Sequence, residues 1–293
     1  MKTIGLIINQ QRDRQFEYAK KTIALLEDNG FQVLLNQSAS ELDDVPMETS
    51  EAFFEECDAF VTLGGDGTIL RIAPMAAKFC KPILGVNLGH LGYLAQLEKN
   101  DLVRLPEILR KETNFEHRFM LRLQIVHSDG SISCHHALND ITLSRQIVSN
   151  MLHAALYSNG EFVYQFRSDG LIFATPTGST AYSMSSGGPI ADCSLNDIII
   201  VTPVCEHSFF SKSMIFSADD TLSCEVKSNQ ENTYIVADGK VLQTTENVSK
   251  ILIDKSEYAV SLFQPNGKRF YRVLNSKFSD GGVNERLTPE SNY

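Results

Sequence analysis

The residues best suited to chemistry form a glycine-rich turn, Gly64-Gly65-Asp66-Gly67-Thr68. Closely spaced glycines let backbone N–H groups approach phosphate oxygens, and a following helix adds the positive end of its dipole. The turn has neither the Gly-Lys-Ser/Thr of a P-loop nor the spacing of a dinucleotide fingerprint. It therefore predicts a phosphate site of another class, with a tight strand-to-helix turn that binds nothing as the alternative interpretation.

A second candidate segment, residues 169–183, is dense in small and hydroxylated side chains and runs on to Gly187-Gly188-Pro189. We expect a strand from Leu171 to Ala174 and a short helix that starts near Thr180. The amino terminus of that helix is a second candidate site for an anion or a ribose. A capped surface helix would explain one or two of the hydroxyls, but not so many beside a tyrosine.

The elements around the glycine turn alternate between strand and helix. The patterns predict strands over 3–8, 31–35, 58–63 and 82–87, with helices between the first two and over 68–79. This alternation is typical of a parallel sheet covered by helices. Pro74 removes a backbone donor inside the second helix, so that helix should be short or kinked.

From about residue 115 the pattern changes to the period of two that is typical of strands. The predicted strands cover 136–145, 151–158, 161–168, 170–175, 197–203, 222–227, 233–237, 248–254 and 258–263. We therefore predict an α/β domain over residues 1–114 and a β-rich domain over 115–268. A helix within 269–280 should pack back on the first domain.

Composition limits the classes of partner. The chain has 293 residues, 43% of them hydrophobic, and a formal net charge of -10. A net negative charge disfavours binding of nucleic acid across the whole surface, so any anionic ligand must be bound by a few groups at one local site. No apolar run reaches the length of a membrane span, and the six cysteines lack metal-site or disulfide spacing, so we expect a cytoplasmic protein.

Four segments together resemble the NAD kinase (ATP-NAD kinase) family. These are the glycine turn, residues 85–93, the segment that starts at Asp169, and Gly187-Gly188-Pro189, and Asn139-Asp140 stands where the family has an Asn-Glu pair. The resemblance spans roughly residues 2 to 275. It implies transfer of the γ-phosphoryl group of ATP to the 2′-hydroxyl of the adenosine ribose of NAD, which gives NADP.

The resemblance also implies roles for individual residues. Asp66 is the catalytic aspartate, with Gly67 against the ligand; Asn139 and Asp140 hold the nicotinamide-side ribose, and Asp169 contacts the nicotinamide end. Further nucleotide contacts are implied at Tyr93, as an adenine wall, and at Asn150, Thr180, Ala181, Tyr182, Ser183, Met184 and Ser185. Weaker candidates are Arg71 for a phosphate, Lys240 beside Asp238-Gly239, and Arg167, which matches members that prefer ATP and NAD and is otherwise a solvated strand residue.

The implied cofactor is Mg²⁺ or Mn²⁺ carried on ATP, with no dedicated protein metal site. The implied partners are NAD, ATP and further copies of the chain in a dimer or tetramer, without nucleic acid or membrane. Two alternatives stay open: a lipid or sugar kinase with the same glycine turn, and a nucleotide-sensing protein without catalysis.

Overall fold

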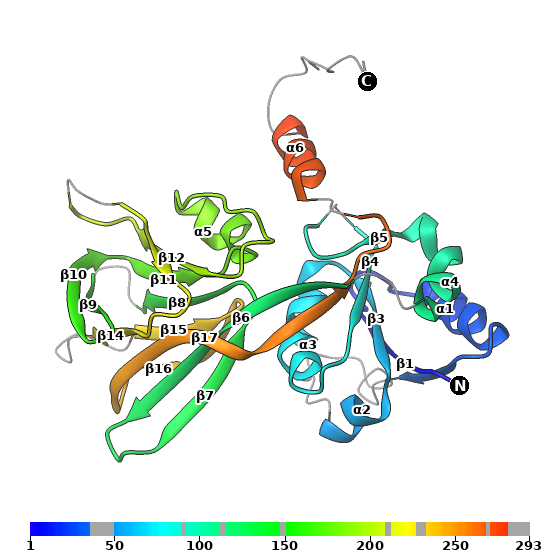
Figure 1. Ribbon diagram of the computed structural model, residues 1–293, viewed down its shortest axis with the longest axis horizontal. Coiled ribbons are helices and arrows are strands. Elements are labelled where there is room, and N and C mark those ends of the chain that lie inside the picture. The colour runs from blue at the N-terminus through cyan, green and yellow to red at the C-terminus, as the bar shows by residue number, and fades with distance from the viewer. Residues whose placement is uncertain are drawn as a thin grey trace.

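The computed structural model describes residues 1–35, 50–89, 92–111, 115–146, 151–208, 212–226, 233–267 and 270–280. Figure 1 shows two halves joined by two long strands, β6 (Phe115–His127) and β17 (Val248–Phe263). These strands pair with each other antiparallel along most of their length. The chain therefore leaves the first half along β6 and returns to it along β17.

The first half is built on a parallel sheet, as its alternating pattern predicted. Its elements are β1 (Thr3–Ile8), α1 (Glu17–Asp28), β2 (Gln32–Leu35), α2 (Glu51–Glu56), β3 (Ala59–Gly64), α3 (Asp66–Lys78), β4 (Ile83–Asn87), β5 (Leu97–Glu98), η2 (Lys99–Arg104) and α4 (Leu105–Arg110). The strand order is β4-β3-β1-β2, and all neighbours are parallel. The chain places β2 on one side of β1 and then crosses back to place β3 on the other side. The carboxyl ends of β1 and β3 thus form a topological switch point, where open α/β sheets bind ligands.

The helix α3 follows the glycine turn without interruption and runs for 13 residues across Pro74. Of the two predicted alternatives, a short helix or a kinked one, the helix is therefore not short, and a kink stays a prediction. Its buried face, Ile69, Ile72, Ala73 and Ala76, packs against the sheet, and this apolar contact offsets the one backbone bond that the proline removes.

The second half is β-rich, as expected. Its elements are β7 (Ile132–Ala137), β8 (Asp140–Arg145), β9 (Leu152–Ser158), β10 (Glu161–Ser168), β11 (Gly170–Ala174), η3 (Gly178–Thr180), α5 (Tyr182–Ser185), β12 (Ile198–Val204), β13 (Met214–Ser217), β14 (Leu222–Val226), β15 (Thr233–Ala237) and β16 (Lys240–Thr244). A six-stranded antiparallel sheet, β13-β12-β11-β8-β15-β16, faces the other strands. Side chains of both sheets share one apolar core, which includes Leu123, Leu156, Leu143 and Leu171.

In the part of the chain that the structure describes, the larger sheet has 11 strands and continues through both halves, because β17 pairs with β4 at Leu262 and Ile83. Two predicted strands, 248–254 and 258–263, are in fact the single strand β17, with an irregularity between Lys255 and Ala259. Because one sheet runs through both halves, the predicted domain boundary at residue 114 stays a prediction.

One predicted strand is broken at a point that matters for the site. The alternation over 136–145 predicted a single strand, but β7 ends at Ala137 in the large sheet and β8 begins at Asp140 in the small one. Leu138 and Asn139 carry the chain from one sheet to the other. Asn139-Asp140 thus lies at a crossing between layers, where its backbone is available to other segments.

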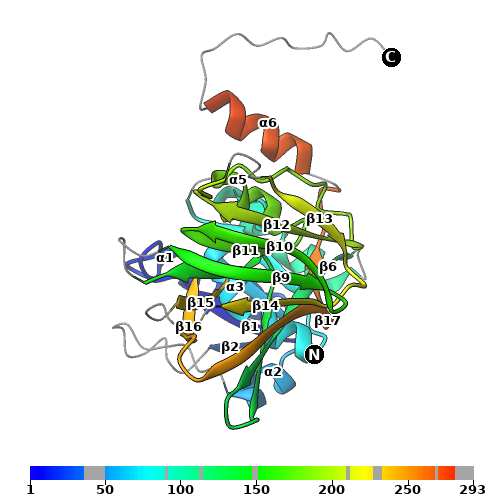
Figure 2. The same ribbon diagram turned by 90° about the vertical axis from the view of Figure 1, so that its left-hand side faces the viewer.

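The last described element, α6 (Phe270–Asp280), stands clear of the strands in both views (Figures 1 and 2). Its first residues contact both halves: the centre of the Phe270 ring lies 6.0 Å from that of Tyr93, and the Tyr271 hydroxyl donates to Asp192.

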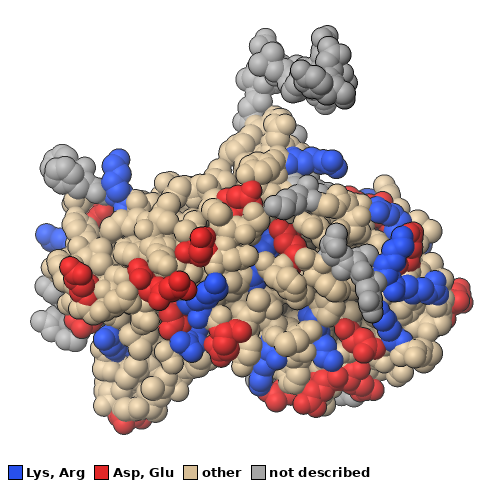
Figure 3. All heavy atoms as spheres, in the orientation of Figure 1, with Lys and Arg blue, Asp and Glu red and all other residues tan. Residues whose placement is uncertain are grey.

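No helix within the described ranges is long and apolar enough to cross a membrane. On the face drawn in Figure 3, acidic and basic side chains are intermingled.

Candidate active site

A cavity opens at the switch point between β1 and β3, directly over the glycine turn. Its volume is about 280 Å³. It is lined by Asn9, Arg12, Gly64, Gly65, Asp66, Gly67, Thr68, Asn87, Gly89, Gly92 and Lys277. The lining comes from the ends of three neighbouring parallel strands and from α6, so distant segments enclose the predicted phosphate site.

The backbone of the glycine turn is exposed to this cavity. A Cβ built on Gly65 or Gly67 would meet no atom within 4 Å, so the main chain there faces open space. Gly64 differs, since a Cβ on it would lie 2.2 Å from the Thr68 hydroxyl. Close approach at Gly64 fixes the turn against α3, while the next glycines leave room for a phosphate at the helix amino terminus.

The carboxylate of Asp66 is held by the backbone of a separate loop. The N–H of Tyr93 donates to Oδ2 at 2.7 Å, and those of Leu94 and Ala95 donate to Oδ1 at 3.1 and 3.2 Å. An ionised carboxylate can accept about four hydrogen bonds. About one acceptor position is therefore left for a ligand, and the other positions fix the orientation of the side chain.

Gly92 makes this grip possible. A Cβ at position 92 would lie 2.1 Å from Oδ1 of Asp66 and 2.5 Å from its Cγ. Only glycine lets the loop approach closely enough for its N–H groups to reach the carboxylate.

A second cavity, of about 380 Å³, lies beside α3 at the crossing between the two sheets. It is lined by Leu70, Asn139, Asp140, Thr142, Ser144, Ala181, Tyr182, Val236, Asp238 and Gly239. The first turn of α3 lines one cavity and Leu70 lines the other. The two cavities thus lie along the same helix.

Asp238 organises the Asn139-Asp140 backbone. Its carboxylate accepts N–H groups from Leu138, Asn139 and Asp140 at 2.8, 2.7 and 3.1 Å. Asp238 adopts a left-handed conformation with φ 47°, in the turn between β15 and β16. Gly178 also packs closely against the Asn139 backbone, since a Cβ on Gly178 would lie 2.0 Å from the carbonyl oxygen of Asn139.

Asp140 is a buried carboxyl group, 6% exposed, and its Oδ1 accepts a hydrogen bond from the Thr142 hydroxyl at 3.3 Å. Burial, and then the charge of Asp238, raise the pKa of Asp140 to about 7. Burial also raises the pKa of Asp238, to about 6, against the opposing effect of its three backbone donors. Because those donors favour the charged form, Asp238 keeps its charge to lower pH than Asp140 does.

Comparison with known proteins connects the two cavities to one family. A model described as the ATP-NAD kinase N-terminal domain matches residues 4–112, and one described as the ATP-NAD kinase C-terminal domain matches residues 138–264. The chain belongs to the NAD kinase family. Its members are phosphotransferases, which agrees with a glycine turn that faces an open cavity.

Relatives match over almost the whole chain. The NAD kinase of Caldanaerobacter subterraneus subsp. tengcongensis is 35% identical over 96% of this chain and 100% of its own length. That of Teredinibacter turnerae is 34% identical over 94% of this chain and 95% of its own length.

Solved structures share the fold. A crystal structure of yeast NADH kinase complexed with NADH superposes with a TM-score of 0.82 at 23% identity, covering 99% of this chain and 90% of its own. An NAD kinase from Archaeoglobus fulgidus, in complex with ATP, gives a TM-score of 0.73 at 27% identity, covering 94% of this chain and 98% of its own. Both confirm the two-part fold expected for the NAD kinase family.

The residues predicted for this NAD kinase family site fall into groups. Asp66 and Gly67 line the cavity at the switch point, and Asn139, Asp140, Ala181 and Tyr182 line the second cavity. Thr180, Met184 and Ser185 lie next to Ala181 and Tyr182 in η3 and α5. Lys240 begins β16, directly after Asp238-Gly239, and Asn150 lies outside the described residues.

Other predicted residues lie elsewhere. Arg71 is exposed on α3 and lines neither cavity, because the buried face of the helix is formed by its neighbours Ile69 and Ile72. Ser183 is fully buried and hydrogen-bonds Thr202, so its side chain has a structural contact instead. The ring of Tyr93 lies against Phe270 and under Lys277, not along either cavity.

Asp169 and Arg167 lie where β10 meets β11 and β12. Asp169 Oδ2 forms an ion pair of 2.8 Å with Arg145, and its backbone N–H donates to Val204. Arg167 has an exposed side chain, and its carbonyl oxygen accepts the N–H of His207. Neither residue lines the two cavities, so their roles toward a dinucleotide stay predictions.

Several residues that line the first cavity are not among those predicted from the sequence, notably Asn9, Arg12, Asn87 and Lys277. A signal existed for the first three, since Asn9 and Arg12 follow a predicted parallel strand, Asn87 ends another, and the carboxyl ends of such strands meet at one edge of the sheet. No local signal marks Lys277, because only the tertiary structure brings α6 to that edge.

The buried carboxyl of Asp140 gives a testable dependence of stability on pH. The folded state raises its pKa from 3.8 to about 7, so it binds the proton more tightly than the unfolded chain does. The resulting stabilisation is fully present below pH 3.8 and is lost as the pH rises through about 7. We therefore expect Asp140→Asn to gain stability relative to the wild type between about pH 5 and about pH 8, by a few kcal/mol at most.

Thermal or urea unfolding across this pH range measures the difference. Asp219→Asn is the matched control, because Asp219 is an exposed carboxylate on the same half of the molecule. A gap between Asp140→Asn and wild type that stays constant with pH would mean that Asp140 keeps one charge state throughout.

Proposed function

We propose that the protein transfers the γ-phosphoryl group of ATP to the 2′-hydroxyl of the adenosine ribose of NAD, giving NADP. The observation that carries the proposal is the Asp66 carboxylate, fixed by three backbone donors beside the exposed glycine-turn backbone. One free acceptor position next to a phosphate cradle suits an acceptor hydroxyl. Membership of the NAD kinase family supplies the identity of the two substrates.

In this proposal the glycine-turn N–H groups and the amino terminus of α3 bind the phosphates of ATP. Asp66 accepts a hydrogen bond from the 2′-hydroxyl and thereby orients the hydroxyl oxygen toward the γ-phosphorus. Phosphoryl transfer passes through a loose transition state that needs little early deprotonation, so orientation outweighs base strength. A carboxylate with three of its positions already occupied fits an orienting role.

The second cavity is the proposed site for the nicotinamide-side ribose, with Asn139 and Asp140 as its hydrogen-bonding residues. Asp140 is one methylene shorter than the glutamate that the family pattern has here. The three hydrogen bonds to Asp238 tie the backbone around Asp140 in place, which offers a reason why a shorter side chain suffices. An ionised Asp140 accepts hydrogen bonds from ribose hydroxyls, so we expect NAD to bind more tightly as the pH rises through about 7.

The donor set fits a divalent ion that arrives on ATP. Among the described residues that line the switch-point cavity, Asp66 is the one carboxylate, and Mg²⁺ is commonly held by one or two carboxylates together with substrate phosphates. Within the described residues, no group of three or more His, Cys, Asp or Glu side chains could hold a metal. When bound, Mg²⁺ or Mn²⁺ would neutralise charge on the phosphates.

The test is direct. Purified protein is incubated with NAD, ATP and Mg²⁺, and NADP is measured with an NADP-specific dehydrogenase. We expect NADP to form in proportion to enzyme and time, and to disappear when ATP or the metal is omitted. No NADP above background, with both nucleotides still bound in equilibrium measurements, would instead favour a nucleotide-sensing protein.

Two finer expectations belong to the same proposal. The family resemblance implies a homodimer or homotetramer, which sedimentation or light scattering measures. It also implies a cytoplasmic enzyme, which fractionation of the source cells would test.

A further inference from the structure

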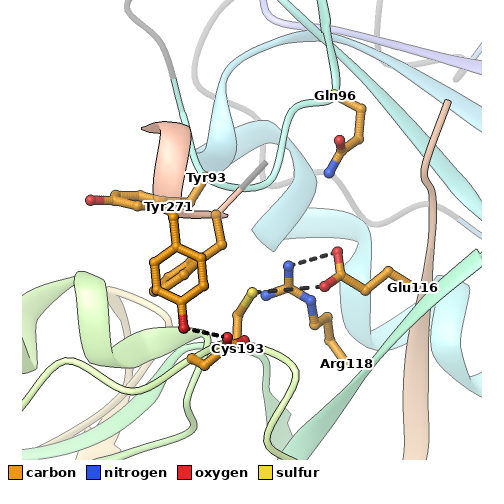
Figure 4. A pocket seen from close by; sticks show the side chains of 8 residues that line it. Tyr93, Gln96, Glu116, Arg118, Cys193 and Tyr271 are labelled. Atoms are coloured by element: carbon orange, nitrogen blue, oxygen red, sulfur yellow. Dashed lines mark hydrogen bonds and ion pairs between the residues drawn. The ribbon is translucent and has the colours of Figure 1, made fainter. Parts of the chain in front are cut away.

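The helix α6 is fixed to the molecule at its first turn. Figure 4 shows the small cavity at this anchor, where the Tyr271 hydroxyl donates to Asp192 at 2.7 Å. The same cavity is lined by buried Arg118, which forms a 2.8 Å ion pair with Glu116, and by Cys193, whose thiol lies 3.7 Å from the Glu116 carboxylate. The cavity measures about 20 Å³, which is room for about one water. The base of α6 is thus closely packed against both halves.

The spacing of residues along α6 places Lys277 on the side of the helix that faces the switch-point cavity. Phe270, Val273 and Lys277 stand at i, i+3 and i+7, so they share one face of the helix. Phe270 packs on Tyr93, and Val273 is only 2% exposed, so this face is turned to the body of the protein. Lys277 continues this face two turns beyond the anchor, where its side chain is exposed to solvent and lines the cavity.

Lys277 reaches the same cavity as the catalytic candidate Asp66. It lines that cavity together with the glycine turn and Arg12. Its Nζ lies 5.0 Å from the centre of the Tyr93 ring, and the N–H of Tyr93 holds the Asp66 carboxylate at 2.7 Å. Tyr93 thus connects the helix to the residue proposed to orient the acceptor hydroxyl.

The charge of Lys277 is not matched by a carboxylate. Within the described chain, no Asp or Glu oxygen lies within ion-pair distance of its Nζ, and the one interaction of this ammonium group there is with the Tyr93 ring. A cation of this kind, beside backbone donors at a helix amino terminus, suits a polyanion. Arg12 and Lys277 would meet such an anion from opposite ends of the sequence.

We propose that Lys277 is a further phosphate-binding residue for ATP, delivered to the glycine turn by the anchored helix α6. This inference rests on the proposed kinase function and assigns the same cavity one more ligand contact. Arg71, the cation that sequence spacing favoured, lines neither cavity, so Lys277 takes the place that Arg71 was expected to fill.

The test removes the charge and keeps a polar side chain that is one atom shorter than lysine. We expect Lys277→Gln to raise the Kd for MgATP about tenfold, the scale of one charge-assisted hydrogen bond, and to change the KM for NAD less than about twofold. Lys277→Arg should restore most of the affinity. The loss should shrink at high salt, because an exposed cation is screened. Isothermal titration of the full chain at two salt concentrations, with steady-state kinetics, gives these values.

Arg272→Gln is the matched control, since Arg272 is an exposed cation on the same helix that lines neither cavity. It should leave the Kd for MgATP within about twofold of the wild type, the small effect of a remote surface charge. Equal losses in Arg272→Gln and Lys277→Gln, or no loss in Lys277→Gln, would overturn the inference while leaving the kinase proposal intact. If MgATP binding depends on Lys277 but no NADP forms, the kinase proposal fails and the phosphate contact stands. A wild type that binds no MgATP would overturn both.

Discussion

Replacing Asp66 by asparagine is expected to lower kcat by at least about 10²-fold. The amide oxygen can still accept the N–H groups of Leu94 and Ala95, which now reach Oδ1. The amide nitrogen, however, would face the N–H of Tyr93, which now donates to Oδ2 at 2.7 Å. Two donors cannot bond each other, so the side chain loses part of its fixed orientation as well as its charge.

Single-turnover and steady-state rates of NADP formation measure this effect, and calorimetry gives the Kd for MgATP. The backbone of the glycine turn is unchanged, so we expect nucleotide binding to change much less than kcat. Asp58→Asn is the matched control, because Asp58 also accepts a backbone N–H, from Thr3 at 2.7 Å, but lines neither cavity. If Asp66→Asn kept its kcat and raised only KM, Asp66 would be a binding residue and the proposed mechanism would be wrong.

Gly92→Ala is the second substitution with a large expected effect. The new methyl group would lie 2.1 Å from Oδ1 and 2.6 Å from Oδ2 of Asp66, far inside contact distance, so the carboxylate or the loop must move. A displacement of about 1 Å in a reacting arrangement can cost about 10²-fold in rate. We expect a fall in kcat of that order, although no charge or hydrogen-bonding group is removed.

The contrast with Gly67→Ala separates orientation from binding. Apart from its chain neighbours and the backbone of its own helix, a Cβ on Gly67 meets no atom within 4 Å, so it extends into the cavity without a clash. Its effect should therefore appear in the affinity for MgATP, whereas that of Gly92→Ala should appear in kcat. A Gly92→Ala enzyme with wild-type kcat would show that the grip of the loop on Asp66 contributes nothing to the reaction.

Asp66 and Gly92 together explain why the glycine turn alone predicts little. The turn supplies the phosphate cradle and places a carboxylate at the start of α3. The position of that carboxylate is set by residues 27 to 29 places further along the chain. The reacting geometry is thus a property of two loops, and a change in either loop that displaces the Asp66 carboxylate should reduce the rate.

Much of the architecture could be predicted from local pattern. Alternating strand and helix signals predicted the parallel sheet of β1 to β4, and strands 161–168 and 233–237 have the bounds that their period-two pattern indicated. These signals are local, because the side chains of a strand or helix repeat with its own period. The motif segments added the family, which the matches over residues 4–112 and 138–264 then showed.

The sequence by itself thus determined the broad order of strands and helices, the family and the candidate carboxylate at Asp66. Only the tertiary structure decided what holds that carboxylate, how Asp238 fixes Asn139-Asp140 from about 100 residues away, and which cations reach the cavity. Arg71 has suitable spacing but lies on the exposed side of α3, whereas Lys277 arrives from the far end of the chain. The physical reason is that hydrogen bonds and charges act between neighbours in space, and periodicity along the chain carries no record of those neighbours.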